Sequence, residues 1–78
     1  MYYVYVLLLK DGSHYIGFSS NLKKRYKTHQ KGEVLFTKNL RPVRLIYYSA
    51  FASKIKALNF EKYLKTPSGF AFRNKRLI

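Results

Sequence analysis

Residues 3–18, with the sequence YVYVLLLKDGSHYIGF, contain the pattern that decides the fold. The apolar run Tyr3–Leu9 shows little alternation of apolar and polar side chains, which is typical of a central strand covered on both faces. Asp11-Gly12 separates this run from a second one, His14–Phe18, and an Asp-Gly pair in that position is a strong β-hairpin signal. The stretch therefore predicts two antiparallel strands, the first of them central in its sheet.

The segment after the hairpin predicts an amphipathic helix. Ser19 or Ser20 is a suitable N-cap, and the helix is expected to run to about Lys31, with Gly32 as its stop. At about 100° per residue, four side chains fall on one face of this helix. They are Leu22, Arg25, Tyr26 and His29.

The second half of the chain predicts one more strand and one more helix. Residues 33–41 are polar and basic and are expected to form a loop, after which Pro42 introduces a strand over Val43–Ser49. Ser53 is a suitable cap for a helix over Lys54–Lys65. The inward face of that helix is expected to centre on Ala57, Phe60 and Leu64.

The order strand, strand, helix, strand, helix indicates an α+β fold. The segment Thr66–Gly69 is expected to end the second helix, and Phe70–Ile78 can add a short basic C-terminal helix. A chain of 78 residues has room for one hydrophobic core, so residues 1–78 are interpreted as a single domain. No cysteine is present, and neither a signal peptide nor a membrane-spanning run is found, which together indicate a cytoplasmic protein.

The charge balance indicates a polyanionic partner. Sixteen Lys and Arg face three acids, Asp11, Glu33 and Glu61, for a net charge of +13. Self-repulsion on this scale destabilises a small compact domain unless a polyanion relieves it. Nucleic acid is the expected partner, with DNA in first place, and an anionic membrane is disfavoured because no helix pairs a basic face with a broad apolar one. A merely soluble protein of high pI is the alternative.

Two positions break the local rules for helices. Lys23, Lys24 and Arg25 lie in the opening turns of the first helix, where each exposed cation forgoes or costs about 0.3–1 kcal/mol against the helix dipole. A bound phosphate would reverse that cost, and a solvated basic turn is the other interpretation. Glu61 lies near the middle of the inward face of the second helix. Either an ion pair with Arg25 or a nearby lysine, or a divalent cation, can satisfy its carboxylate.

These positions carry a resemblance to the GIY-YIG nuclease family. Tyr3-Val4-Tyr5 and Tyr15-Ile16-Gly17 resemble the two halves of the family signature. Asn21-Leu22, Arg25 and His29 resemble the motif of its first helix, and Ala57, Glu61 and Lys65 resemble that of its second helix. The four motifs run in order from Tyr2 to Lys65, and the chain is most similar to the small stand-alone bacterial members.

The resemblance implies a three-stranded antiparallel sheet, first strand central, flanked by helices. It also implies an endonuclease that hydrolyses phosphodiester bonds in DNA or structured nucleic acid with Mg²⁺ or Mn²⁺ and without a small-molecule cofactor. By resemblance, the roles fall on Tyr5 and Tyr15 as the tyrosine pair, Arg25 as the phosphate contact, His29 as an accessory group, Glu61 as the metal ligand and Gly17 as a structural residue. Further contacts with nucleic acid are expected from Lys23, Lys24, Lys27, Lys38, Arg41 and Lys65.

Other interpretations of the same residues remain open at this point. A tyrosine is more often a packing residue than a catalyst, and a histidine on an apolar face is more often a hydrogen-bonded core residue. The first signature motif lacks its glycine, Phe18 stands where some members carry a lysine, and Asn74 only approximates a late asparagine of the family. A non-catalytic nucleic-acid-binding module on the same scaffold is therefore the alternative function, and an RNA- or ribosome-associated protein is a third.

Overall fold

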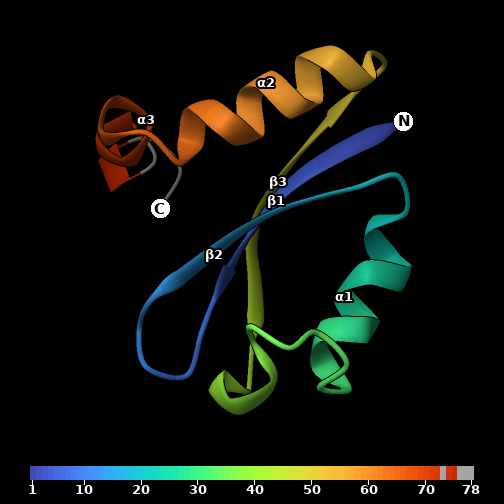
Figure 1. The fold of residues 1–78 in the computed structure, drawn as a ribbon, viewed down its shortest axis with the longest axis vertical. Helices are drawn as coiled ribbons and strands as arrows, with labels where there is room; N and C mark the ends of the chain where they lie inside the picture. Colours follow the sequence, from blue (N-terminus) through green and yellow to red (C-terminus); the bar gives the residue numbers. More distant parts are fainter. Residues whose placement is uncertain (73, 76–78) are drawn as a thin grey trace.

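The computed structural model describes residues 1–72 and 74–75, which form an antiparallel sheet and flanking helices (Figure 1). The strands are β1 (Tyr2–Leu8), β2 (His14–Ser19) and β3 (Arg44–Phe51), in the order β2-β1-β3. The α-helices are α1 (Leu22–Gln30), α2 (Lys54–Leu64) and α3 (Pro67–Phe72). The predicted α+β class and the central position of the first strand are both confirmed.

The hairpin forms where the Asp-Gly pair predicted it. Gly12 has φ +85°, a left-handed conformation that glycine adopts without strain, and the Asp11 carboxylate accepts a hydrogen bond from the Ser13 backbone N–H at 3.0 Å. The register of β1 and β2 places Tyr5 opposite Gly17. This pairing fixes the relation between the two halves of the signature.

The first helix starts at a different cap from the one predicted. Asn21, rather than Ser19 or Ser20, is the N-cap, and its side chain accepts a hydrogen bond from the Lys24 backbone N–H at 3.1 Å. Ser19 still belongs to β2, and its hydroxyl bonds to the backbone of Asn21 instead. Gly32, with φ +79°, lies just after the helix as predicted.

The expected loop and third strand differ from the prediction in their limits. Residues 33–41 contain a short 3₁₀-helix, η1 (Lys38–Leu40). The strand β3 runs to Phe51 rather than to Ser49, because its pairing with β1 continues as far as Tyr2. The Phe51 ring also packs on Phe60 of α2, with ring centroids 5.5 Å apart.

The second helix agrees with the prediction, but the segment after it does so only in part. Ser53 caps α2, and Ala57 and Leu64 are fully buried. The helix ends at Leu64, so Thr66–Gly69 follows its end as expected, but Pro67–Gly69 also begins a further helix, α3, in which proline occupies the first position, where its missing N–H costs nothing. The remainder of the predicted C-terminal helix includes residues 73 and 76–78, which lie outside the described residues.

Both faces of β1 are covered, which explains its unalternating apolar sequence. On one face, Val4 and Val6 pack with Ile16 and with α2 residues. On the other face, Tyr5 and Leu7 form a second buried cluster that includes Leu22 and Tyr26 of α1. In Figure 1, α2 crosses the upper part of the view and α1 lies at the lower right. None of the helices in residues 1–72 and 74–75 is long and apolar enough to cross a membrane.

One close approach in the sheet can be tested by substitution. A Cβ placed on Gly17 would overlap the ring and hydroxyl of Tyr5, which is 1% exposed. We expect Gly17→Ala to lower the free energy of unfolding by about 1–3 kcal/mol, the usual cost of overpacking a core. Chemical denaturation measures this loss. In a Tyr5→Leu background, which lacks the overlapping atoms, Gly17→Ala should cost much less; an equal cost in both backgrounds would contradict the assignment.

Candidate active site

A chain of hydrogen bonds links β1, α1 and the following loop through buried side chains. The Tyr5 hydroxyl is 2.9 Å from His29 Nε2, and His29 Nδ1 is 2.9 Å from the Thr37 hydroxyl. His29 and Thr37 are both fully buried. Because both nitrogens of the imidazole have partners, its ring is held in one orientation.

The second tyrosine of the signature joins this cluster from the neighbouring strand. The Tyr15 ring lies edge-on to His29, with centroids 5.1 Å apart, and its centroid is 6.3 Å from that of Tyr5. Phe36, from the loop after α1, packs on Tyr15 at 5.4 Å. Tyr15 is only half-buried, so it is the member of the tyrosine pair that is open to solvent.

Arg25 brings a permanent positive charge to the two phenols. Hydrogen bonding to Tyr5 is the largest influence on the Arg25 guanidinium and raises its pKa, and Tyr15 contributes in the same direction. The Nε–H of Arg25 is buried and has no hydrogen-bond partner among the described residues. A buried donor without a partner is costly, so this N–H can donate to an oxygen of a ligand with a gain in free energy.

The local field makes Tyr5 a neutral phenol and His29 a neutral imidazole near pH 7. Burial raises the pKa of Tyr5, and the hydrogen bond from Arg25 only partly offsets this effect. Burial, followed by the positive charge of Arg25, lowers the pKa of His29 to about 4. Since Arg25 can only donate, the Tyr5 hydrogen is directed to His29 Nε2, and the Nδ1–H of His29 then donates to Thr37.

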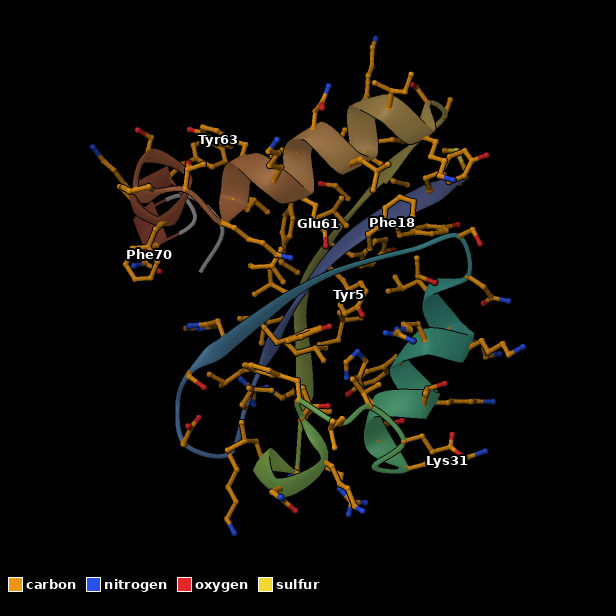
Figure 2. All side chains as sticks on the ribbon, in the orientation of Figure 1. Tyr5, Phe18, Lys31, Glu61, Tyr63 and Phe70 are labelled. Carbon is orange, nitrogen blue, oxygen red and sulfur yellow. The ribbon has the colours of Figure 1, made fainter. Side chains whose placement is uncertain are left out.

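Glu61 lies on α2, which packs on the other face of the sheet from α1. Its side chain is 20% exposed, and its Oε2 lies 3.2 Å from the Lys65 ammonium. Its negative charge contributes to the raised pKa of Tyr5. Figure 2 shows the Glu61 carboxylate directed from α2 toward the part of the sheet where Tyr5 lies. The ion pair with a nearby lysine, one of the two alternatives for Glu61, is thus present beside the predicted site.

The donor set around Glu61 fits a hydrated magnesium or manganese ion. Within residues 1–72 and 74–75, no group of three or more His, Asp or Glu side chains could hold a metal. Mg²⁺ commonly binds one or two protein carboxylates and completes its octahedron with water and substrate phosphates. A single, partly exposed carboxylate such as that of Glu61 meets that requirement.

The lysines predicted to contact nucleic acid are exposed around α1 and η1. Lys23, Lys24, Lys27 and Lys38 all belong to this exposed set. Lys24, Arg25 and Thr28 line a hollow of about 320 Å³ beside the N-terminus of α1. Lys65 lines a second hollow of about 350 Å³, together with Tyr15 and Phe36. These two hollows therefore lie beside the tyrosine cluster, and each is lined by at least one basic side chain.

Arg41 differs from the other predicted contacts because it is tied to the protein backbone. Its Nε donates to the carbonyl of Lys38 at 3.0 Å, and its Nη1 donates to that of Gln30 at 3.4 Å. Its guanidinium also covers Gly32, where a Cβ would lie 2.6 Å from Arg41 Cζ. Arg41 thus holds the loop after α1, and its contact with nucleic acid stays a prediction.

Two members of the cluster were missed by sequence reasoning. Thr37 and Phe36 belong to the segment expected to be a loop, and neither carries a periodic or motif signal. Phe18, which stands where some family members carry a lysine, packs into the α2 core and stacks on Tyr2 at 6.1 Å. That position contributes packing rather than charge.

Comparisons with known proteins show the family of the chain. A family model described as the GIY-YIG catalytic domain matches residues 1–76. The chain is 48% identical to a UPF0213 protein of Lacticaseibacillus paracasei over 65 residues, which are 82% of this chain and 73% of the relative. It is 42% identical to a UPF0213 protein of Streptococcus pneumoniae over 64 residues, which are 81% of this chain and 65% of the relative.

A solved structure is also similar. The solution NMR structure of a UPF0213 protein from Bacillus halodurans superposes with a TM-score of 0.61 and 35% sequence identity. The match covers 96% of this chain and 82% of that one.

The neutral, buried state of His29 predicts a pH-dependent stability. The unfolded chain protonates this residue near its ordinary pKa of 6.5, whereas the folded chain resists protonation down to about pH 4. Between these values the unfolded state binds more protons, so the free energy of unfolding should fall as the pH is lowered, by roughly 1–3 kcal/mol. Thermal denaturation from pH 7 to pH 4 measures the slope. We expect His29→Gln to flatten it, and an unchanged slope would contradict the assignment.

Proposed function

The chain belongs to the GIY-YIG family, and from that premise we propose that it is an endonuclease that hydrolyses phosphodiester bonds in DNA or structured nucleic acid, with a divalent metal ion as its cofactor. The observation that carries the proposal is the Arg25 guanidinium, which lies beside the phenols of Tyr5 and Tyr15 and has one buried N–H without a partner among the described residues. These are the groups that phosphoryl chemistry needs.

Arg25 supports binding of the scissile phosphate. A guanidinium offers planar, charged donors that match the non-bridging oxygens of a phosphate. The Tyr5 contact holds the side chain in place, and the unpartnered Nε–H gains a partner when a phosphate oxygen arrives. The lysines around α1 would contact neighbouring phosphates.

Glu61 would hold the divalent cation, with waters and phosphate oxygens as the other ligands. When bound, such a cation polarises the phosphoryl oxygen and lowers the pKa of coordinated water. The ion pair with Lys65 would orient the carboxylate in the free protein. Lys65 is exposed and flexible enough to move from the carboxylate to a phosphate.

The two tyrosines would have different roles. Tyr5 is 1% exposed, has a raised pKa and is hydrogen-bonded to His29, so we assign it to positioning Arg25. Tyr15 is half-buried and lines the hollow that contains Lys65, so we assign its hydroxyl to a hydrogen bond that orients the attacking water molecule. His29 and Thr37 would hold Tyr5 in the required orientation.

A non-catalytic nucleic-acid-binding module is the second candidate function. The observation that favours it is the Glu61–Lys65 ion pair, since a purely structural glutamate would make the same contact. Both functions predict binding that weakens steeply with salt, because both rest on phosphate contacts. Cleavage therefore separates them.

Glu61→Gln tests the assignment. We expect purified protein to cleave nucleic acid with Mg²⁺ or Mn²⁺ and Glu61→Gln to abolish cleavage, because the neutral amide loses the charge that holds the cation. Binding to the same substrate should change little. A substrate panel of single-stranded, duplex and branched DNA and RNA, assayed with and without metal, measures both steps.

Glu33→Gln is the matched control, since Glu33 is an exposed acid in the loop after α1. It should cleave at the rate of the unmodified protein. Metal-dependent cleavage that survives both Glu61→Gln and Arg25→Ala would defeat the site assignment.

Thr37→Val tests the hydrogen-bond chain behind Tyr5. The substitution keeps the shape of the side chain but removes the acceptor of the His29 Nδ1–H, and one hydrogen bond is worth about 1 kcal/mol. We expect roughly fivefold slower cleavage, with ¹⁵N NMR of the imidazole showing a changed tautomer balance. Thr37→Ser should restore both. A Thr37→Val protein with an unchanged imidazole spectrum would show that the bond does not set the tautomer.

A further inference from the structure

One face of the sheet is left partly uncovered because its helix is short. The nine residues of α1 extend about 13 Å, whereas the eight residues of β3 extend about 27 Å. Beyond the N-terminus of α1, the side chains of Tyr3 and Tyr48 stand on the open part of this face. They are cross-strand neighbours with ring centroids 6.3 Å apart, and Tyr48 is 54% exposed.

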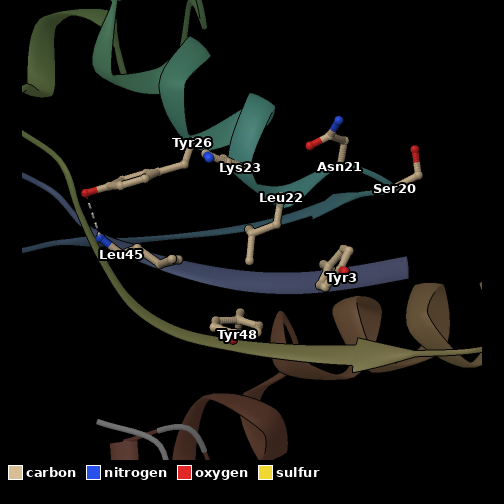
Figure 3. A pocket seen from close by; sticks show the side chains of 8 residues that line it. All are labelled: Tyr3, Ser20, Asn21, Leu22, Lys23, Tyr26, Leu45 and Tyr48. Carbon is tan, nitrogen blue, oxygen red and sulfur yellow. Dashed lines mark hydrogen bonds between the residues drawn. The ribbon is translucent and has the colours of Figure 1, made fainter. Parts of the chain in front are cut away.

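The two tyrosines border a hollow of about 600 Å³, a volume within the usual range for ligand pockets. Figure 3 shows the hollow between the first turn of α1 and the sheet, with Leu22 directed toward the strands. Tyr26 forms a fixed part of its wall, because its hydroxyl accepts a hydrogen bond from the Leu45 backbone N–H at 3.4 Å. The wall of the hollow therefore includes a tyrosine fixed by a hydrogen bond, Tyr26, and an exposed tyrosine ring, Tyr48.

We propose that this hollow binds a single unpaired nucleotide of the substrate, with its base stacked on the exposed ring of Tyr48 and bordered by Tyr3. Exposed aromatic side chains on a sheet face are a sequence-tolerant platform for unstacked bases, since every base has a flat π surface. The inference rests on the proposed function and narrows its substrate to nucleic acid with at least one unpaired base near the cleaved bond.

The charges around the hollow favour a nucleotide over an uncharged ligand. Lys23 lies on its wall, in the first turn of α1, and can meet the phosphate that the base carries. The whole chain has a net charge of +13, which favours an anionic occupant throughout. An apolar peptide would gain nothing from these cations.

The hollow adjoins the one that contains Arg25 of the candidate active site. Ser20 and Asn21 line both this hollow and the smaller one that contains Arg25. A nucleic-acid strand that crosses the N-terminus of α1 at these two residues would place one nucleotide in the hollow beside Tyr48. Its next phosphates would then lie at Lys24 and Arg25. Stacking would thus set the position of the scissile bond.

Binding of short oligonucleotides tests the proposal without cleavage. Fluorescence anisotropy of a labelled 12-nucleotide oligothymidine and of a 12-base-pair duplex is measured in EDTA for the unmodified protein and three variants. Stacking on one ring is worth about 1–3 kcal/mol, so Tyr48→Ala should weaken binding of the single strand about 5- to 150-fold. Binding of the duplex should change by less than about twofold.

Two variants serve as controls. Tyr48→Phe keeps the flat ring and should retain single-strand binding. Tyr63→Ala removes a tyrosine from α2 that is 41% exposed and belongs to neither hollow, so it should leave binding unchanged. NMR of the unmodified protein should show shifts at Tyr3, Lys23 and Tyr48 when the oligothymidine is added, which tests the site even if a variant fails to fold.

The outcomes separate this proposal from the proposed function. Unaltered single-strand binding by Tyr48→Ala, or an equal loss on the duplex, would overturn the nucleotide site while Glu61-dependent cleavage could still stand. A selective loss with no cleavage by any protein would support the nucleotide site and overturn the nuclease. Oligothymidine shifts confined to other residues would also overturn the site.

Discussion

The contact between Tyr5 and Gly17 is the constraint on which the rest of the site depends. These residues face each other across the two strands of the hairpin, and the ring of Tyr5 occupies the space that a Cβ on residue 17 would fill. Only a glycine permits this approach. The ring can therefore lie beneath β2, where its hydroxyl meets His29 and the charge of Arg25.

The electrostatics of the site follow from how few acids the chain contains. One carboxylate, Glu61, lies near a cluster that otherwise contains neutral rings and Arg25. Lys65 pairs with that carboxylate in the free protein, and Arg25 retains an unpartnered buried N–H. The site therefore presents unsatisfied positive charge, and a phosphate with its cation would complement it.

The features that could be predicted from the sequence are those that hydrophobic periodicity and turn chemistry control. The unalternating run of β1, the Asp-Gly turn and the shared face of Arg25 and His29 needed only local rules. The influence of Glu61 on the pKa of Tyr5 had no such signal, since the two residues are 56 positions apart, and a shared site was expected only by family resemblance. Thr37 was missed because its partner, His29, lies across an irregular loop. The start of α3 at Pro67 was missed because proline and glycine normally signal a break.

We propose that Glu61, Arg25 and the two tyrosines form one site for a cation beside a phosphate. Addition of Mn²⁺ to ¹⁵N-labelled protein tests it most directly, because a bound paramagnetic ion broadens the NMR signals of nearby nuclei. We expect broadening of the NMR signals of Glu61 and of the facing part of β2. A nucleotide should strengthen this broadening, and Glu61→Gln should abolish it. Broadening centred elsewhere, or unchanged by that substitution, would contradict it.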